Sequence, residues 1–198
     1  MTKTENAHWE NPMGTAGFEF VEYSSPEPKK LEELFIALGF TLVATHKSKQ
    51  VKLFRQGNIN FILNAQPGSY AEQFHKKHGP CACALGFRVQ NALEAYKKAV
   101  SLNARPHNCN PGFMELNIPA VEGVGGALLF FINLYGEHNI YQIDFDFIDH
   151  VDMSQNSVGL HSIDHVTHNV MQGGMDHWAH FYENLFNFKE TRYFDIKG

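Results

Sequence analysis

Two histidines lie close together in a short apolar segment near the end of the chain, Ile163–Val170. Imidazole nitrogens bind transition metals, so a metal-binding role is the chemistry these residue types suggest. The segment has the pattern of a β-strand, in which alternate residues share a face. Because Ile163 is apolar, we expect its face, which includes His165, to point into a concave interior. His168 is then on the opposite face and does not readily bind the same ion.

His165 by itself does not make a metal site. A mononuclear ferrous centre usually needs two histidines and one carboxylate on one side, with open positions left for ligands. His177 and His180 are near in sequence, but we expect them on a helix, as solvated or partly packed surface residues. A buried, hydrogen-bonded core histidine is therefore an alternative interpretation of His165.

A second group of metal-binding residue types occurs in the middle of the chain, at His75, His78, Cys81 and Cys83. Its spacing, His-x2-His-x2-Cys-x-Cys, fits no common structural zinc pattern, and Gly79-Pro80 interrupts it. A loop followed by buried cysteines is the simpler interpretation.

The other candidate motifs in the chain are more typical of structural elements than of catalytic or binding sites. Gly123, Gly125 and Gly126 lack the strand-turn-helix context of a phosphate loop and are more typical of a turn between strands. Asp144 and Asp146 are expected on one solvated face of a strand, between the apolar residues of the segment 141–147. A Gly-x-Ser-x-Gly motif does not occur in the sequence, and neither does a Cys/His nucleophile arrangement.

The elements that would position His165 repeat an earlier part of the chain. One helical stripe comprises Leu31, Leu34, Phe35 and Leu38, and the same spacing returns at Trp178, Phe181, Tyr182 and Leu185. Each stripe follows a short apolar strand, Gly17–Tyr23 in the first copy and residues 163–169 in the later one. Aligning these strands places Phe20 where the later copy has His165. The pattern indicates a structural copy followed by a metal-binding copy.

The whole chain divides into units of this kind. In the first, a helix opens near Ser24-Ser25-Pro26 and ends at Gly39, and three strands follow at 40–46, 51–55 and 59–63, the last two joined by a turn at Gly57-Asn58. After a polar loop, the second unit has strands at 83–89, 105–108, 115–118 and 127–133. Its helix is capped by Asn91 and Glu94 and carries an apolar stripe of Leu93, Tyr96 and Val100. The third unit breaks off after a strand over 190–196.

Two complete βαβββ modules and half of a third are thus predicted, an α+β fold whose modules pair into curved, barrel-like domains. The expected division is a lead-in over 1–13, a structural domain over 14–148, a linker over 149–159, and the start of another domain over 160–198. The formal net charge of -5 argues against nucleic-acid binding. The apolar stretches are too short to span a bilayer, and three cysteines give no disulfide framework. The cytoplasm is the expected compartment.

The sequence closely resembles the N-terminal part of the bacterial 4-hydroxyphenylpyruvate dioxygenase family, in the vicinal-oxygen-chelate superfamily. Collinear matches run through nearly the whole chain: Asn11–Gly14, Gly17–Glu22, Ala44–Lys49, Phe54–Gly57, His78–Pro80, Met114–Ala120, Ile163–Val170, Phe181–Phe188 and Arg192–Gly198.

This resemblance implies an Fe(II) enzyme of tyrosine catabolism that converts 4-hydroxyphenylpyruvate and O2 to homogentisate and CO2. It implies that His165 is the first iron ligand, that the second histidine and the glutamate lie beyond residue 198, and that the full-length protein is a homo-oligomer. The chain alone is then expected to be inactive. Two alternatives remain: an enzyme similar to hydroxymandelate synthase, and a non-catalytic ligand-binding or assembly module of the same fold.

Overall fold

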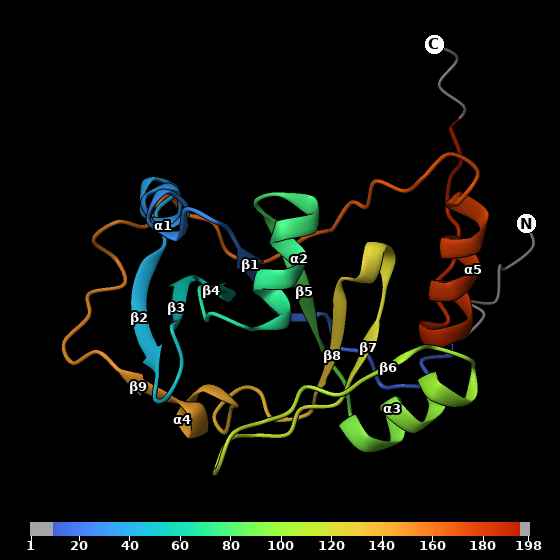
Figure 1. Ribbon diagram of the computed structural model, residues 1–198, viewed down its shortest axis with the longest axis horizontal. Coiled ribbons are helices and arrows are strands. Elements are labelled where there is room, and N and C mark those ends of the chain that lie inside the picture. The colour runs from blue at the N-terminus through green and yellow to red at the C-terminus, as the bar shows by residue number, and fades with distance from the viewer. Residues whose placement is uncertain (1–9, 195–198) are drawn as a thin grey trace, which may run out of the picture.

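The computed structural model describes residues 10–194, and they build one curved sheet of nine strands (Figure 1). The strand order is β6-β7-β8-β5-β1-β4-β3-β2-β9. Residues 1–9 and 195–198, which include most of the expected lead-in and the end of the last expected strand, lie outside the described residues. No helix within residues 10–194 has the length and apolar character needed to cross a membrane.

The first module contains β1 (Phe18–Ser24), α1 (Pro28–Ala37), β2 (Thr41–His46), β3 (Val51–Gln56) and β4 (Ile59–Asn64). Strands β2, β3 and β4 follow the helix and pair with one another in antiparallel order. Strand β4 also lies beside β1 and runs parallel to it, with Val21 opposite Phe61. The predicted turn between β3 and β4 is confirmed, and Gly57 supplies the positive φ of 55° that it needs. The helix begins at Pro28 and not at Pro26, because Ser25 still accepts a hydrogen bond from the backbone N–H of Glu27.

The second module repeats this order with β5 (Cys81–Arg88), α3 (Ala92–Ser101), β6 (Pro106–His107), β7 (Ala120–Glu122) and β8 (Leu128–Ile132). Strand β8 lies parallel to β5, and β5 joins the two modules by running antiparallel to β1. The prediction of paired βαβββ modules is therefore confirmed. The turn expected between β7 and β8 is a short 3₁₀ helix, η1 (Val124–Gly126).

Several elements differ from the sequence expectations. The polar loop between the modules contains a helix, α2 (Tyr70–His78), whose Ser69 cap accepts a hydrogen bond from Glu72. The strand expected over 115–118 is wrong, because these residues belong to a long loop and β7 starts at Ala120. The segment 141–147 is only partly a strand: α4 (Tyr141–Asp144) precedes β9 (Phe145–Phe147), which pairs with β2.

The helices α1, α3 and α5 (Met175–Phe186) cover one face of the sheet, termed here the outer face. Two predicted apolar stripes are only partly buried. On α1, Phe35 is buried and Leu31 packs against the core, while Leu34 is exposed. On α3, Tyr96 packs against the core, while Leu93 is 54% exposed. The buried residues of α3 are Ala92, Ala95 and Ala99. Their small side chains let the helix backbone lie close to the sheet, which turns the larger residues outward.

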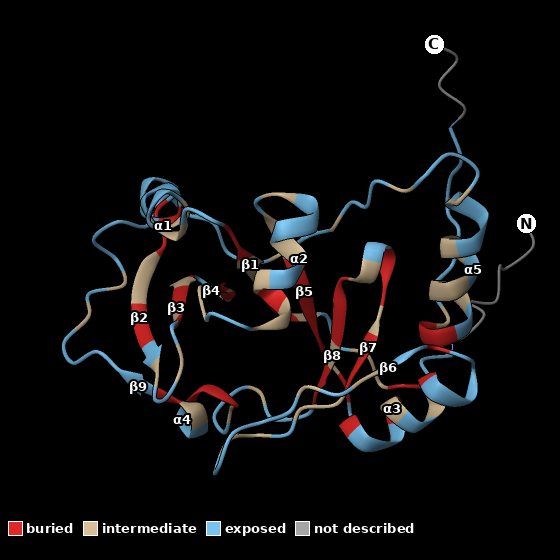
Figure 2. Ribbon diagram, viewed as in Figure 1, coloured by how far each residue is buried: buried red, intermediate tan, exposed pale blue. Residues whose placement is uncertain are grey.

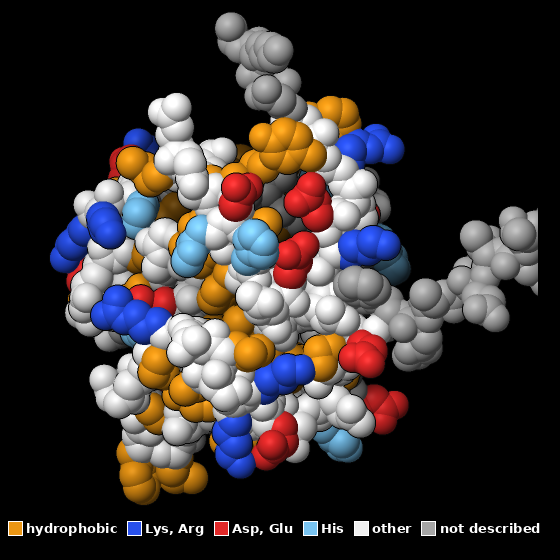
Figure 3. Space-filling view, turned by 90° about the vertical axis from the view of Figure 1, so that its right-hand side faces the viewer, with side chains coloured by type: hydrophobic (Ala, Val, Ile, Leu, Met, Phe, Trp, Pro, Cys, Tyr) orange, Lys and Arg blue, Asp and Glu red, His pale blue; other side chains and the backbone are white. Residues whose placement is uncertain are grey.

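The C-terminal helix α5 shares the core of the second module. Leu185 and Phe186 are buried, and the Phe186 ring lies 4.8 Å from that of Phe87 on β5. Buried residues concentrate on the strands, with fewer on the helices (Figure 2). The face that carries α5 mixes acidic, basic, histidine and hydrophobic side chains (Figure 3), and Met171 and Met175 are among the exposed hydrophobic residues of this part of the chain.

The segment between β9 and α5 crosses the molecule from the β9 edge of the sheet to the second module (Figure 1). It has no helix or strand, so the strand expected over 163–169 is wrong for this structure. A strand needs a neighbouring strand to satisfy its backbone groups, and the described residues offer this segment none. Ile163 and Val166 instead pack against the outer-face core.

Candidate functional site: a cavity on the inner face of the sheet

His165 lies on this crossing segment and not in a concave interior. Its side chain is 74% exposed, and its Nδ1 lies 2.8 Å from a carboxylate oxygen of Asp164. The expectation that His165 faces inward is therefore wrong for the described residues, because it depended on a strand that is not formed. His168 lies 3.3 Å from the Tyr182 hydroxyl. Within residues 10–194 no group of three His, Cys, Asp or Glu residues is placed to hold a metal ion.

The side chains of His75, His78, Cys81 and Cys83 also do not come together as a metal site in the described part of the chain. Nδ1 of His75 on α2 lies 2.7 Å from the hydroxyl of Ser24, while Cys83 is buried on β5 and its thiol donates to the backbone carbonyl of Glu22 at 3.5 Å. All three cysteines of the chain are free. His177 and His180 are exposed on α5, as the sequence predicted. Asp144 ends α4 and does not share a strand face with Asp146.

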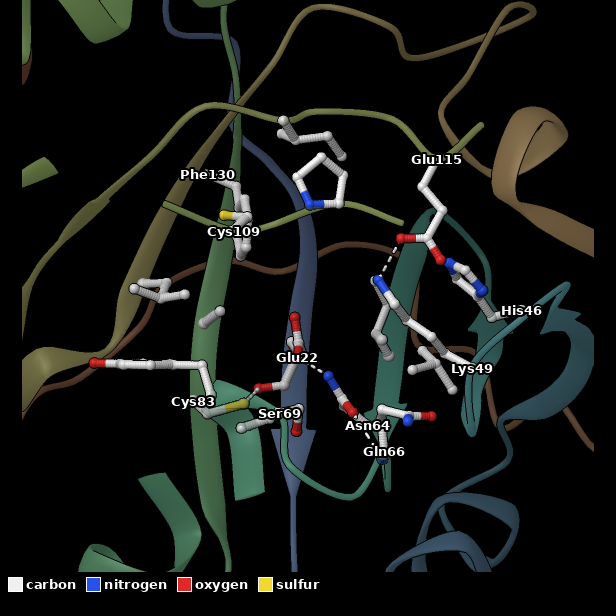
Figure 4. A pocket seen from close by; sticks show the side chains of 18 of the residues that line it. Glu22, His46, Lys49, Asn64, Gln66, Ser69, Cys83, Cys109, Glu115 and Phe130 are labelled. Atoms are coloured by element: carbon white, nitrogen blue, oxygen red, sulfur yellow. Dashed lines mark hydrogen bonds and ion pairs between the residues drawn. The ribbon is translucent and has the colours of Figure 1, made fainter. Parts of the chain in front are cut away.

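The structure instead places a cavity of about 550 Å³ on the inner face of the sheet (Figure 4), opposite α1, α3 and α5. Its floor is formed by inward residues of the central strands, including Phe20 on β1, Ile62 on β4 and Phe130 on β8. The start of α2 lines one side, and the long β6–β7 loop contributes Cys109, Glu115 and neighbouring residues. Phe20 thus lies on the concave face, as the strand alignment predicted, with its ring 5.8 Å from that of Phe130.

Glu22 is the acidic residue of the cavity floor. One of its carboxylate oxygens accepts a hydrogen bond from the amide nitrogen of Asn64 at 2.7 Å. The amide orientation of Asn64 is fixed because its oxygen accepts the backbone N–H of Gln66 at 3.0 Å. Burial raises the pKa of the Glu22 carboxyl, and the hydrogen bonds from Asn64 and Cys83 and the charge of Lys49 only partly oppose that rise.

Glu115 fastens the β6–β7 loop over the cavity. Its carboxylate accepts hydrogen bonds from Lys49 at 2.6 Å, from the Ser48 hydroxyl at 2.5 Å and from the backbone N–H of Gly112 at 2.6 Å. Desolvation acts to raise the pKa of Glu115, but these three donors outweigh it and lower the pKa to about 2. The loop is also held at Leu116, whose backbone N–H donates to the Asp144 carboxylate.

The basic side chains that line the cavity are His46, His107 and Lys49, and together they contribute little unpaired positive charge. Burial lowers the pKa of His46 and of His107, so both imidazoles are neutral near neutral pH. Lys49 is the only lysine or arginine among the described residues that line the cavity, and Glu115 already pairs with it. The carboxylates of Glu115 and Asp144 already outnumber this single cation, which gives the cavity a negative balance over an aromatic and aliphatic floor.

Sequence reasoning missed this cavity, although part of it carried a signal. Alternation along β1 places Glu22 on the same face as Phe20, so a charged residue on an inward face could have been noticed. The contact between Lys49 and Glu115 had no such signal, since the two residues come from loops 66 positions apart. The polar stretch before β5 concealed α2, which forms one wall.

Two paired βαβββ modules around an inner-face cavity define a protein of the vicinal-oxygen-chelate fold. A solved xylose isomerase-like TIM barrel/4-hydroxyphenylpyruvate dioxygenase fusion protein shares this fold, with a TM-score of 0.78 and 33% sequence identity, over 91% of this chain and 29% of that one. The family described as hydroxyphenylpyruvate dioxygenase, HPPD, N-terminal, matches residues 9–146. The chain belongs to this family.

Curated relatives extend the match to almost the whole chain. A 4-hydroxyphenylpyruvate dioxygenase from Pseudomonas sp. (strain P.J. 874) is 54% identical over 191 residues, which is 96% of this chain and 54% of the relative. Hemolysin VllY from Vibrio vulnificus (strain CMCP6) is 52% identical over 193 residues, covering 95% and 54% of the two chains. The chain thus spans about half the length of the curated relatives it matches.

Proposed function

We propose that this chain is the N-terminal part of an Fe(II)-dependent 4-hydroxyphenylpyruvate dioxygenase, a cytoplasmic enzyme that converts 4-hydroxyphenylpyruvate and O2 to homogentisate and CO2. The observation that carries the proposal is the 54% identity to a dioxygenase of that name across 96% of the chain. Residues 14–148 form the structural domain in this proposal, and residues from 160 onward begin the catalytic domain. The full-length enzyme is expected to be a homo-oligomer.

Within the proposed enzyme, His165 supplies one iron ligand. Its Nδ1 faces the Asp164 carboxylate, an arrangement that favours a proton on Nδ1 and leaves the Nε2 lone pair available for a metal. Ferrous iron held by two histidines and a carboxylate supplies dioxygen activation and chelation of a 2-oxo acid. The described residues do not themselves fit such an ion, because they bring no second or third ligand to His165. The other two ligands must come from outside residues 10–194.

The test compares the full-length enzyme with its His165→Ala variant. The wild-type protein should bind iron and consume O2 with 4-hydroxyphenylpyruvate, whereas the variant should lose both iron and turnover. His138→Ala, on an exposed loop, is the matched control and should retain both. Chromatography of the product distinguishes homogentisate from hydroxymandelate. Failure of the wild-type enzyme to turn over this substrate contradicts the proposal, as does a His165→Ala variant that keeps its iron.

A second comparison concerns the 198-residue chain alone. It should not consume O2 with 4-hydroxyphenylpyruvate and added iron, because one proposed ligand of three is present. Turnover by this chain would mean that the described residues hold the metal by an arrangement other than the one proposed.

A further inference from the structure

The cavity on the inner face is large enough for a small molecule and does not involve His165. Ligand sites in proteins are typically hollows of about 300–1,000 Å³ with mostly apolar walls and a few placed polar groups. The volume of about 550 Å³ lies within that range. Phe20 and Ile62 contribute to an apolar floor. Phe130 lies on the same floor, and Glu22 gives it a carboxyl group (Figure 4).

Glu22 is not explained by a role in folding. Its raised pKa means that burial disfavours the charged form of this carboxyl group, so the fold gains nothing from that charge. Asn64 donates to one carboxylate oxygen, and the amide oxygen of a glutamine at this position could accept the same hydrogen bond. A buried carboxyl group with a raised pKa that lines a cavity is typical of a binding site.

The charge of the cavity selects the kind of ligand. The ammonium group of Lys49 is paired with Glu115 at 2.6 Å, and His46 and His107 are neutral because burial lowers their pKa values. An anionic ligand would therefore meet carboxylates without an unpaired cation among the described lining residues. A cationic ligand would favour the ionised form of Glu22 and pair with its carboxylate.

We propose that this cavity binds a primary amine carried on a compact aromatic or aliphatic body, with the ammonium group on the Glu22 carboxylate and the body against Phe20 and Phe130. The inference is independent of the proposed dioxygenase activity, because it uses none of the iron ligands. The β6–β7 loop, fastened by Glu115, covers the ligand in this arrangement.

The experiment titrates 2-phenylethylamine into the 198-residue chain by isothermal titration calorimetry. Wild-type protein should bind the amine, and Glu22→Gln should bind at least about tenfold more weakly, because an ion pair in a partly desolvated site is lost. Glu33→Gln removes the same charge from the exposed face of α1 and should leave binding unchanged. Phenylacetate and 2-phenylethanol carry a similar body without the positive charge and should bind at least about tenfold more weakly than the amine.

A second measurement locates the ligand without relying on any variant. In amide correlation NMR spectra of the wild-type chain, the amine should shift the signals of Glu22, Asn64 and the loop residues near Glu115. No binding of the amine overturns the proposal. Equal affinity of wild type and Glu22→Gln, tighter binding of phenylacetate, or shifts confined to other parts of the chain would each overturn it as well.

Discussion

The side-chain oxygen of Gln56 accepts a hydrogen bond from the backbone N–H of Val158 at 2.8 Å, across 102 positions of the chain. The same oxygen accepts from the backbone N–H of Leu160 at 3.2 Å, and the Gln56 amide donates to the carbonyl of Leu38 at 3.0 Å. Gly39 lies so close to this segment that a Cβ there would come within 2.6 Å of the Asn156 carbonyl oxygen. The expected linker is thus hydrogen-bonded to the first module at this point.

These hydrogen bonds predict that the substitution Gln56→Met detaches the segment around residues 158–160 from the first module. Methionine fills a similar volume but removes the hydrogen bonds to the amides of Val158 and Leu160 and to the carbonyl of Leu38, each of which contributes about 0.5–1.5 kcal/mol. We expect the free energy of unfolding to fall by about 2–3 kcal/mol, and amide hydrogen exchange at 158 and 160 to accelerate. Gln172→Met, at an exposed position, is the control and should have little effect. Unchanged exchange at 158 and 160 would contradict the prediction.

The packing of α5 predicts that the C-terminal helix stabilises the second module. Leu185 is 1% exposed within the outer-face core, so Leu185→Ala should lower the free energy of unfolding by about 2–5 kcal/mol. Leu93→Ala on α3 is the matched control, because Leu93 is 54% exposed, and it should cost less than about 0.5 kcal/mol. Denaturant unfolding of both variants measures the difference. Similar losses for the two substitutions would mean that α5 does not contribute to this core.

The lowered pKa of Glu115 predicts that the β6–β7 loop over the cavity is released in acid. Its pKa is lowered in the folded state from 4.5 to about 2. An acid with a lowered folded pKa stabilises the fold above its unfolded pKa, and that contribution is lost as pH falls through the folded value. The stability difference between wild type and Glu115→Gln should therefore be fully present above pH 4.5 and shrink as pH falls from 4.5 toward about 2.

Denaturant unfolding at several pH values in this window measures that difference directly. Glu33→Gln, on the exposed face of α1, is the control for removal of one negative charge, and it should stay within about 0.5 kcal/mol of wild type throughout. A wild-type advantage over Glu115→Gln that does not change between these pH values would mean that the hydrogen bonds of Glu115 do not act through its charge.

The sequence by itself determined the local elements and their repetition. Apolar alternation predicted β1, the Gly57 turn predicted the β3–β4 hairpin, and Asn91 predicted the start of α3, where its side chain accepts from the backbone N–H of Glu94 at 3.1 Å. These features depend on residues near one another in the chain, and their φ/ψ and hydrogen-bonding preferences act locally. The same patterns placed Phe20 on the inner face.

Only the tertiary structure decided which faces are buried and which residues meet. The sequence placed Leu93 in the apolar stripe of α3, yet Leu93 is 54% exposed and the buried residues of this helix include Ala95 and Ala99, whose small side chains allow a closer approach to the sheet. The alternating pattern of residues 163–169 is compatible with a β-strand. A strand forms only beside a partner strand, however, and this segment has none among the described residues. The cavity likewise depends on sheet register and on a long loop, which bring Glu22, Lys49 and Glu115 together from separate parts of the chain.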